Sequence, residues 1–328
     1  MHTRHALLLA TAVLFIVPVL FATAQTPTGG GAAPASQPAA NPNSPIDHSV
    51  PPQQLGNGYK FTEGCTSDDK GNVYFVDQDN NRIHLWNAAD NKISIFMEPT
   101  NYSNGMCLDN DGNLIACADG KNELWKISIP DKKVTVLLKD YQGKLLNGPN
   151  DVFVIPAGPL KGDMYITDPL FARRWWAGFR TNDSQQPGQY VFYVSADGKT
   201  IKPVITDMRT PNGIIGTPDG KTLYASDFYG NATNTYTINP DGTLSDKKKF
   251  NDVGSDGMTI DSDGNIYTTN GNTRQGLQVW DKNGKMVDQF NVGCANVCIG
   301  GKDLNTLFVC TQNAVWGLKL KTKRVGPQ

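Results

Sequence analysis

The chain has 328 residues, a hydrophobic content of 39% and a formal net charge of −1 at pH 7. A charge so close to zero gives no electrostatic reason to expect a partner such as nucleic acid or an anionic membrane surface. With 33 glycines and 20 prolines, the composition disfavours a helical enzyme and fits a turn-rich protein built from many short strands.

The N-terminus has the three parts of an export signal. Arg4 precedes an almost wholly apolar run, residues 6–21, and Ala22–Ala24 supplies the small residues of a cleavage site. We therefore expect residues 1–24 to be a signal peptide. The protein would then be exported, to a periplasmic or extracellular location, with no stable membrane association after cleavage. Because the apolar run is long for a signal peptide, a retained membrane anchor is the alternative.

Residues 25–57 follow as a segment rich in Pro, Ala, Gly, Thr and Ser, with few side chains that could be buried. Such a composition is typical of a disordered tether. The folded domain is accordingly expected to span residues 58–328.

One pattern recurs six times in this domain. A small polar residue stands just before a hydrophobic strand pattern, and a turn rich in Gly, Asn or Asp follows. These marker residues are Glu63, Asn104, Asn150, Asn212, Asp256 and Asn296. Their successive separations are 41, 46, 62, 44 and 40 residues, and a period of about 40–45 residues with four strands per repeat is typical of β-propeller blades. The sequence therefore predicts an all-β, six-bladed β-propeller with four-stranded antiparallel blades, closed by pairing of residues 59–61 with the last repeat.

The longest separation contains an inserted loop, residues 169–188, between the second and third strands of the third repeat. Long loops in compact domains often act as lids or binding loops. Arg173, Arg174, Trp175 and Trp176 are expected to cover the mouth of a pocket and to bind an anionic or polyhydroxy ligand. The alternative is that the tryptophans only hold the loop against the domain.

The cysteines are even in number, which in an exported protein is compatible with disulfides. They are Cys65, Cys107, Cys117, Cys294, Cys298 and Cys310. Cys107 and Cys117 flank one predicted hairpin, and Cys298 and Cys310 flank another, so these are the candidate pairs. Buried free thiols are the alternative, and none of the spacings is the CxxC of a metal site.

Radial repetition would bring the six marker residues together at one place. Two carboxylates and four amides there are the hard oxygen ligands that Ca²⁺ prefers. For any single marker, the competing explanation is turn chemistry, because Asn-Gly and Asp-Gly are common turn dipeptides. The shared phase and Glu63, which is not a turn former, favour a site. A zinc site or a histidine-based triad is disfavoured, because the mature chain would hold only His48 and His84.

A family resemblance is carried, in the family's own order, by the segments TEGCTSDDKGNVYFVDQDNNRIHLW, KLLNGPNDVFV, DMYITDP, RTPNGIIGTPDGKTLYASD and GSDGMTIDSDGNIYTTN. Together they resemble the gluconolactonase, senescence-marker-protein and luciferin-regenerating-enzyme family over residues 58–321. The resemblance implies a six-bladed propeller that holds a divalent cation in its central channel and hydrolyses sugar lactones. That cation is usually Ca²⁺, with Zn²⁺ or Mg²⁺ as other possibilities.

Carried over residue by residue, the resemblance implies a metal-binding set of Glu63, Asn150, Asn212 and Asp256, with Asp256 also the catalytic general base. The substrate-binding set is expected to comprise Asn104, Asn147, Arg173, Arg174 and Trp175. The chain departs from the family at Cys65, where Glu-Gly-Pro is usual, and at residues 168–172, which read Asp-Pro-Leu-Phe-Ala instead of Asp-Pro-Pro-Tyr-Gly. The second departure leaves the sugar specificity open.

The predicted function is a metal-dependent hydrolase that opens sugar lactones, in which the cation polarises the carbonyl and a carboxylate activates water. Because a cation lowers the pKa of a carboxylate that binds it, Asp168 and Asp227 are reserve candidates for the base. The alternatives are a ligand-binding propeller without catalysis and a hydrolase of other esters or phosphotriesters. The expected partner is a small-molecule lactone, and the sequence leaves the oligomeric state open.

Overall fold

The computed structural model describes residues 41–271 and 275–326, all within the compact unit Gly31–Gln328. These residues form 22 β-strands and two short 3₁₀ helices, η1 (Gln78–Asn80) and η2 (Arg174–Trp176). The prediction of an all-β propeller with four-stranded antiparallel sheets is confirmed. The expected signal peptide, residues 1–24, lies outside the described residues. Within the described part of the chain, no helix has the length and apolarity needed to cross a bilayer.

Four sheets contain four antiparallel strands each, and their strands follow one another along the chain. The first holds β5 (Ser103–Leu108), β6 (Leu114–Ala118), β7 (Glu123–Ile127) and β8 (Val134–Leu138). The second holds β9 (Val152–Val154), β10 (Met164–Asp168), β11 (Tyr190–Val194) and β12 (Ile201–Ile205). The third holds β13 (Pro211–Gly216), β14 (Thr222–Asp227), β15 (Ala232–Ile238) and β16 (Leu244–Asn251). The fourth holds β17 (Met258–Ile260), β18 (Ile266–Thr269), β19 (Leu277–Trp280) and β20 (Met286–Phe290).

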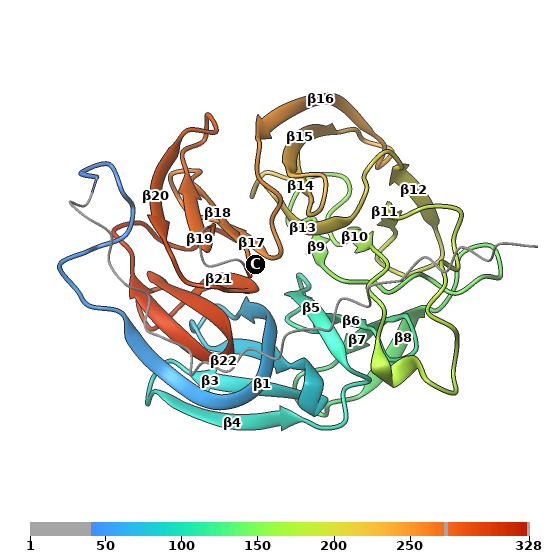
Figure 1. Ribbon diagram of the computed structural model, residues 1–328, viewed down its shortest axis with the longest axis horizontal. Coiled ribbons are helices and arrows are strands. Elements are labelled where there is room, and N and C mark those ends of the chain that lie inside the picture. The colour runs from blue at the N-terminus through green and yellow to red at the C-terminus, as the bar shows by residue number, and fades with distance from the viewer. Residues whose placement is uncertain (1–40, 272–274, 327–328) are drawn as a thin grey trace, which may run out of the picture. The chain divides into compact units, whose positions relative to one another are not determined.

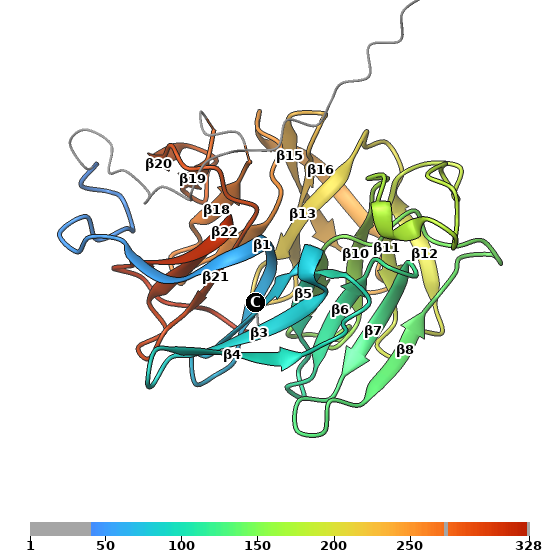
Figure 2. The ribbon, with the colours of Figure 1, turned by 60° about the horizontal axis from the view of Figure 1, so that its bottom comes forward.

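The fifth sheet has six strands, in the order β21-β22-β1-β2-β3-β4. Its strands are β21 (Asn296–Gly300), β22 (Thr306–Lys319), β1 (Gln53–Ser67), β2 (Val73–Asp77), β3 (Arg82–Asn87) and β4 (Lys92–Met97). The structure thus has five sheets where the repeat count predicts six blades. The sheets surround a common axis, and β5, β9, β13, β17 and β21 lie nearest to it (Figure 1). Figure 2 shows β1, β5 and β13 from the side.

Pairing of the two ends of the domain differs in position from the prediction. Residues 53–57 of β1 pair with residues 314–317 of β22, upstream of the expected residues 59–61. Lys60 and Phe61 instead donate their backbone N–H groups to Asp77 Oδ1, each at 3.1 Å. Pairing with β22 resumes at Thr62, opposite Gln312, after a register shift that begins at Asn57. The closing strand therefore begins earlier than predicted.

Part of the expected tether is folded against the domain, near the end of β22 and against β20. Ile46 is buried and forms an isolated bridge with Leu320. His48 Nε2 lies 2.6 Å from Asp288 Oδ2, and the His48 ring stacks on Phe290. A few buried side chains and a strand starting at Gln53 thus order residues whose average composition is that of a linker. The rest of the expected tether, residues 25–40, lies outside the described residues.

Three of the turns between a first and a second strand share one construction. Asp109 Oδ1 accepts backbone N–H groups from Asp111 at 2.9 Å and Asn113 at 2.8 Å, and Gly112 adopts a φ of +79°. Asp68 and Asp261 do the same two and four residues downstream. Side-chain capping by Asp together with a glycine at positive φ is a stable turn, so the Asp-Gly-Asn segments are hairpin turns.

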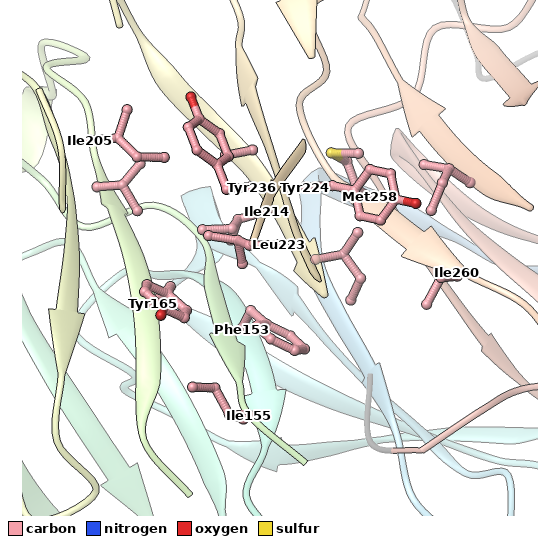
Figure 3. Packing of buried hydrophobic residues seen from close by; sticks show 14 of the residues in the cluster. Phe153, Ile155, Tyr165, Ile205, Ile214, Leu223, Tyr224, Tyr236, Met258 and Ile260 are labelled. Atoms are coloured by element: carbon pink, nitrogen blue, oxygen red, sulfur yellow. The ribbon is translucent and has the colours of Figure 1, made fainter. Parts of the chain in front are cut away.

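Apolar side chains fill the spaces between neighbouring sheets. The cluster in Figure 3 joins the second, third and fourth of the four-stranded sheets, and it includes Phe153, Tyr165, Ile214, Leu223 and Met258. Fully burying a side chain of this kind contributes about 1.5–3 kcal/mol to folding. The strands are therefore held in place mainly by packing between sheets, which fixes the ends of the inner strands.

Ile155→Val is expected to lower the free energy of unfolding by about 0.5–1.5 kcal/mol, because it removes a methylene group from a fully buried position and leaves a small cavity. Ile95→Val is the matched control, since that side chain is 50% exposed. Urea unfolding of both variants measures the difference. Equal losses for the two would contradict the assignment of Ile155 to the core.

All six cysteines are buried free thiols. The predicted pairs are out of register: Cys107 lies opposite Ile115 instead of Cys117, and Cys298 lies opposite Phe308 instead of Cys310. Each pair is therefore diagonal across its hairpin, an arrangement with longer separations than directly opposite residues have. The alternative of buried thiols is the one that the structure contains.

Candidate functional site

A cavity of about 170 Å³ lies at the axial ends of the inner strands. It is lined by Phe61, Glu63, Asn104, Asn150, Phe171, Arg173, Asn212, Phe228 and Asp256. Five of the six marker residues are in this set. The sixth, Asn296, is buried and donates from Nδ2 to Glu63 Oε2 at 3.0 Å. The shared phase of the repeat therefore does bring these side chains together.

A larger cavity of about 460 Å³ lies at the opposite ends of the inner strands. Its lining comes from hairpin turns, such as Ser67–Lys70, and from Arg324 near the C-terminus. The aspartates there are engaged in their own turns, as Asp68 and Asp109 show. The smaller cavity is the better candidate site, because its polar groups converge from five different strands or strand ends.

The backbone at the marker residues is irregular in a way that aims the side chains at the axis. The ladder between β1 and β2 shifts register between Glu63 and Thr66, and the ladder between β5 and β6 does so between Ser103 and Met106. A similar irregularity follows Pro211 in β13. Such bulges re-aim side chains and are frequent near functional sites.

The glycines after the marker residues allow neighbouring inner strands to approach closely. A Cβ on Gly64, which has a φ of +46°, would lie 1.8 Å from the carbonyl oxygen of Asn104. A Cβ on Gly105 would lie 2.3 Å from the carbonyl oxygen of Asn150, and its N–H donates to that oxygen at 2.7 Å. These glycines therefore serve inter-strand contact, and the turn explanation of the Glu-Gly and Asn-Gly pairs does not apply here.

Hydrogen bonds hold the amide groups so that their oxygens remain free. Asn212 donates from Nδ2 to Asp256 Oδ1 at 2.8 Å, and Asn104 donates from Nδ2 to Gln78 Oε1 at 3.4 Å. The Oδ1 atoms of Asn104 and Asn212 are buried and have no hydrogen-bond partner among the described residues. Buried polar atoms in native proteins are nearly always paired, so these two oxygens are available to accept a bond from a ligand or water in the cavity.

The carboxyl groups of the site crowd one another. Burial raises the pKa of Glu63 well above its usual range, and the charges of Asp256 and Asp151 raise it further. Burial also raises the pKa of Asp256 to about 6, against the opposing effects of Asn212 and Arg173. Asp151 is buried beside Asn296 in a narrow cavity beneath the site, and burial and Asp256 raise its pKa. A bound cation would relieve this repulsion.

The residues present fit a hard cation that takes mixed ligands. Among residues 41–271 and 275–326, no group of three or more His, Cys, Asp and Glu side chains is placed to hold a metal. Glu63 and Asp256 supply two carboxylates, and the remaining oxygens at the cavity come from asparagine side chains. Ca²⁺ accepts this combination of carboxylate, amide and water oxygens.

Two of the five predicted substrate-binding residues, Asn104 and Arg173, line the cavity. Asn147 is fully buried and holds the inserted loop, donating from Nδ2 to Gly188 O at 2.9 Å. Arg174 is exposed, does not line the cavity and pairs with Asp79 at 3.0 Å. The Trp175 ring stacks on Tyr102 at 4.5 Å. Arg173, Arg174 and Trp175 thus have different partners although they are consecutive in sequence, and the sequence pattern does not reveal this.

Some residues of the inserted loop hold it against the domain, and others reach the cavity. Trp176 is fully buried and donates from Nε1 to Asp119 O at 2.7 Å, while the guanidinium group of Arg180 lies 4.2 Å from the centre of the Trp176 ring. This tryptophan holds the loop against the domain. Phe171 and Arg173, earlier in the loop, reach the cavity.

Asp168 and Asp227, the reserve candidates for the base, both accept hydrogen bonds from backbone N–H groups. Asp168 is fully buried and accepts N–H groups from Asn147 and Gly148 at 2.9 Å each, while burial raises its pKa to about 7. Asp227 accepts N–H groups from Arg209 and Thr210 at 2.8 Å each. These carboxylates shape loops and do not line the cavity, where the two carboxylates are those of Glu63 and Asp256.

The sequence analysis did not identify Phe61, Phe228, Asp119 or Asp151. Asp151 could have been found in the segment LLNGPNDVFV, directly after a marker residue. The two phenylalanines and Asp119 carry no motif, and only the fold brings them to the site.

The chain is similar in sequence to proteins of a known family. The family model described as "SMP-30/Gluconolactonase/LRE-like region" matches residues 61–313. The chain belongs to this family. A gluconolactonase from Zymomonas mobilis is 26% identical over 308 residues, covering 84% of this chain and 83% of that protein.

Solved structures agree on the fold of this family member. A gluconolactonase from Xanthomonas campestris superposes with a TM-score of 0.75 at 22% identity, covering 90% of this chain and 99% of that chain. A calcium-binding protein, regucalcin, from Agrobacterium tumefaciens has a TM-score of 0.67 at 17% identity, covering 84% of this chain and 96% of that chain. At these identities the likeness concerns the propeller architecture alone.

Proposed function

We propose that this protein is a metal-dependent hydrolase that opens lactones of the sugar-lactone class, with Ca²⁺ as its cation. The observation that carries the proposal is the pair of buried, unpartnered amide oxygens in a cavity that also holds Glu63 and Asp256. That of Asn212 would bind the cation, and that of Asn104 the substrate. Membership of a family whose curated relative is a gluconolactonase supports the choice of lactones.

The residues that would hold the cation are Glu63, Asn150, Asn212 and Asp256. The two carboxylates balance the charge of a divalent ion, and the amides add neutral oxygens. Asn296 orients Glu63 through its hydrogen bond to Oε2, and Asn212 orients Asp256 through its bond to Oδ1. Ca²⁺ fits this all-oxygen set better than Zn²⁺ does, because Zn²⁺ sites typically use His and Cys side chains.

The proposed chemistry divides between the ion and the chain. Ca²⁺ bound in the cavity would supply Lewis acidity to the lactone carbonyl. Asp256 would accept the proton of the attacking water, at Oδ2, because Oδ1 already accepts a hydrogen bond from Asn212. Phe61, Phe171 and Phe228 would flank the ring of the substrate and keep bulk water away from the carbonyl.

The propeller itself is proposed to have six blades, with the six-stranded sheet forming two of them. The inner strands β1, β5, β9, β13, β17 and β21 contact one another successively around the axis. The residues that flank β22 bond to each other, Leu320 N donating to Asn305 O at 2.8 Å, and within β22 Thr311 donates from Oγ1 to Ala314 O at 3.0 Å. Both bonds are expected where a strand folds back on itself. The sixth blade would then consist of β21, the two halves of β22 and residues 53–57 of β1.

Export is part of the same proposal. Residues 1–24 would be removed as a signal peptide, and the domain would act in a periplasmic or extracellular space. N-terminal sequencing of protein recovered from a secreted or periplasmic fraction tests this. A sequence starting near residue 25 is expected, and an intact N-terminus in a membrane fraction would support the retained anchor instead.

The decisive test is hydrolysis of a panel of five- and six-membered sugar lactones by protein treated with a chelator, with and without added Ca²⁺. We expect turnover with Ca²⁺ and its loss on chelation. Calorimetric Ca²⁺ binding without turnover would favour a ligand-binding propeller. Turnover of phosphotriesters or simple esters, with lactones inert, would favour the alternative hydrolase.

A further inference from the structure

The inserted loop places one positively charged side chain, that of Arg173, at the cavity and holds it there. Arg173 Nε donates to Asp119 Oδ2 at 2.7 Å, and the Asp119 side chain is only 2% exposed. The guanidinium carbon lies 5.5 Å from the centre of the Phe171 ring and 5.4 Å from that of Trp175. An ion pair on one edge and aromatic rings at the guanidinium leave this side chain little freedom.

The other edge of the guanidinium group is available to a ligand. The hydrogen bond to Asp119 uses Nε, and neither terminal nitrogen has an acceptor among the described residues. The side chain of Arg173 is 19% exposed, and it is the one basic side chain among the residues that line the cavity. It also lies close enough to Asp256 for its charge to lower the pKa of that carboxyl group.

Asp119 connects this arginine with a second residue of the cavity. Gln78 donates from Nε2 to Asp119 Oδ2 at 3.3 Å, and its Oε1 accepts the hydrogen bond from Asn104. The backbone oxygen of Asp119 accepts the indole N–H of Trp176, which anchors the loop. One buried carboxylate thus sets the positions of Arg173 directly and of Asn104 through Gln78.

We propose that Arg173, positioned by Asp119, is an anion-binding group at the mouth of the cavity, and that it selects lactones carrying a carboxylate substituent, such as acid-sugar lactones, over neutral lactones. The proposal rests on the proposed lactone hydrolysis and adds the substrate class. The free edge of the guanidinium group, with its two terminal nitrogens, matches the planar geometry of a carboxylate. With the two site carboxylates balanced by a divalent ion, the substrate carboxylate would have Arg173 as its partner.

The test compares Arg173→Met with Arg174→Met, a neighbouring arginine that points outward and pairs with Asp79. Arg173→Met is expected to lower kcat/KM for an aldaric-acid monolactone by roughly 10- to 150-fold, chiefly through KM, because hydrogen bonds to a charged group are lost. Its kcat/KM for the neutral lactone of an aldonic acid is expected to stay within about 3-fold. Arg174→Met should leave both substrates unchanged. An equal loss for the two lactones, or no loss, would overturn the proposal.

Asp119→Asn and Arg173→Lys separate positioning from charge. Asp119→Asn keeps the arginine but weakens its hold, so it should raise KM for the acid lactone without changing Ca²⁺ affinity measured by calorimetry. Arg173→Lys should retain part of the preference for the acid lactone that Arg173→Met loses, since lysine keeps the positive charge but lacks the paired N–H groups of the guanidinium. Melting temperatures close to that of the native protein establish that the variants fold.

A binding measurement keeps this inference distinct from the proposed reaction. Titration of an open-chain aldarate dianion into the Ca²⁺-loaded protein should show binding that Arg173→Met weakens and Arg174→Met does not. If no lactone is opened while this difference holds, the proposed activity fails and the anion site stands. Equal aldarate affinities for the native protein and Arg173→Met would refute the anion site whatever the activity.

Discussion

Asp256→Asn is expected to lower kcat for lactone opening by roughly 10²–10⁴-fold, the contribution typical of a positioned general base. The substitution preserves the shape of the side chain, and its amide oxygen can still accept the hydrogen bond that Asn212 donates to Oδ1. It removes the group that would accept the proton of water. Steady-state kinetics at saturating Ca²⁺ measure the loss.

Because Asp256 is also a proposed ligand of the cation, the two roles must be separated. Glu63→Gln is the matched comparison, since it removes a ligand carboxylate that is held by Asn296 and Gly64 and is not proposed to move a proton. Both variants should bind Ca²⁺ more weakly by calorimetry. Excess Ca²⁺ should restore kcat for Glu63→Gln and leave Asp256→Asn inactive. Full recovery of Asp256→Asn would assign that residue to metal binding alone.

The repeat pattern was sufficient to predict which side chains converge. A residue in the same phase of every repeat reaches the same end of its inner strand, so Glu63, Asn150 and Asp256 could be grouped without coordinates. The same reasoning predicted four strands per sheet, because turn residues alternate with short apolar runs in each repeat. Periodicity constrains position around and along the axis, whereas the choice of four of the six residues as predicted metal ligands came from the family resemblance.

Features that do not belong to the sequence repeat could not be predicted from its periodicity. Arg173 lines the cavity and pairs with Asp119, whereas the adjacent Arg174 pairs with Asp79, and the sequence of the loop does not reveal this difference. Asp119 acts through contacts with Gln78 and with the inserted loop, which lie 41 and 54 residues away in the sequence. The closing strand begins at Gln53, inside a segment whose average composition is that of a linker.

The glycines of the marker motifs show how one pattern can have two physical causes. Asn-Gly and Asp-Gly are turn dipeptides in isolation, and Asp111-Gly112 lies in such a turn. Gly64 and Gly105 instead lie where adjacent inner strands come into contact near the axis. The sequence does not distinguish these cases, because the constraint on the second kind comes from a strand about 40 residues away.

Gly64→Ala is therefore expected to lower the free energy of unfolding by about 3 kcal/mol or more and to abolish Ca²⁺ binding. A φ of +46° is unfavourable for alanine, by about 1–2 kcal/mol. The added Cβ would also lie 1.8 Å from the carbonyl oxygen of Asn104, a backbone atom that can move only with β5. Since Glu63 accepts the N–H of Gly64, any shift that relieves the contact displaces a proposed ligand.

Gly112→Ala is the control that separates backbone strain from this contact. Gly112 has a φ of +79°, and a Cβ there would meet no atom within 4 Å. Its substitution should cost only the left-handed strain, about 1–2 kcal/mol, with Ca²⁺ affinity and lactone turnover unchanged. Urea unfolding and Ca²⁺ calorimetry on both variants give the comparison. If Gly64→Ala behaved like Gly112→Ala in both measurements, close approach of the inner strands would not be what holds Glu63 at the cavity.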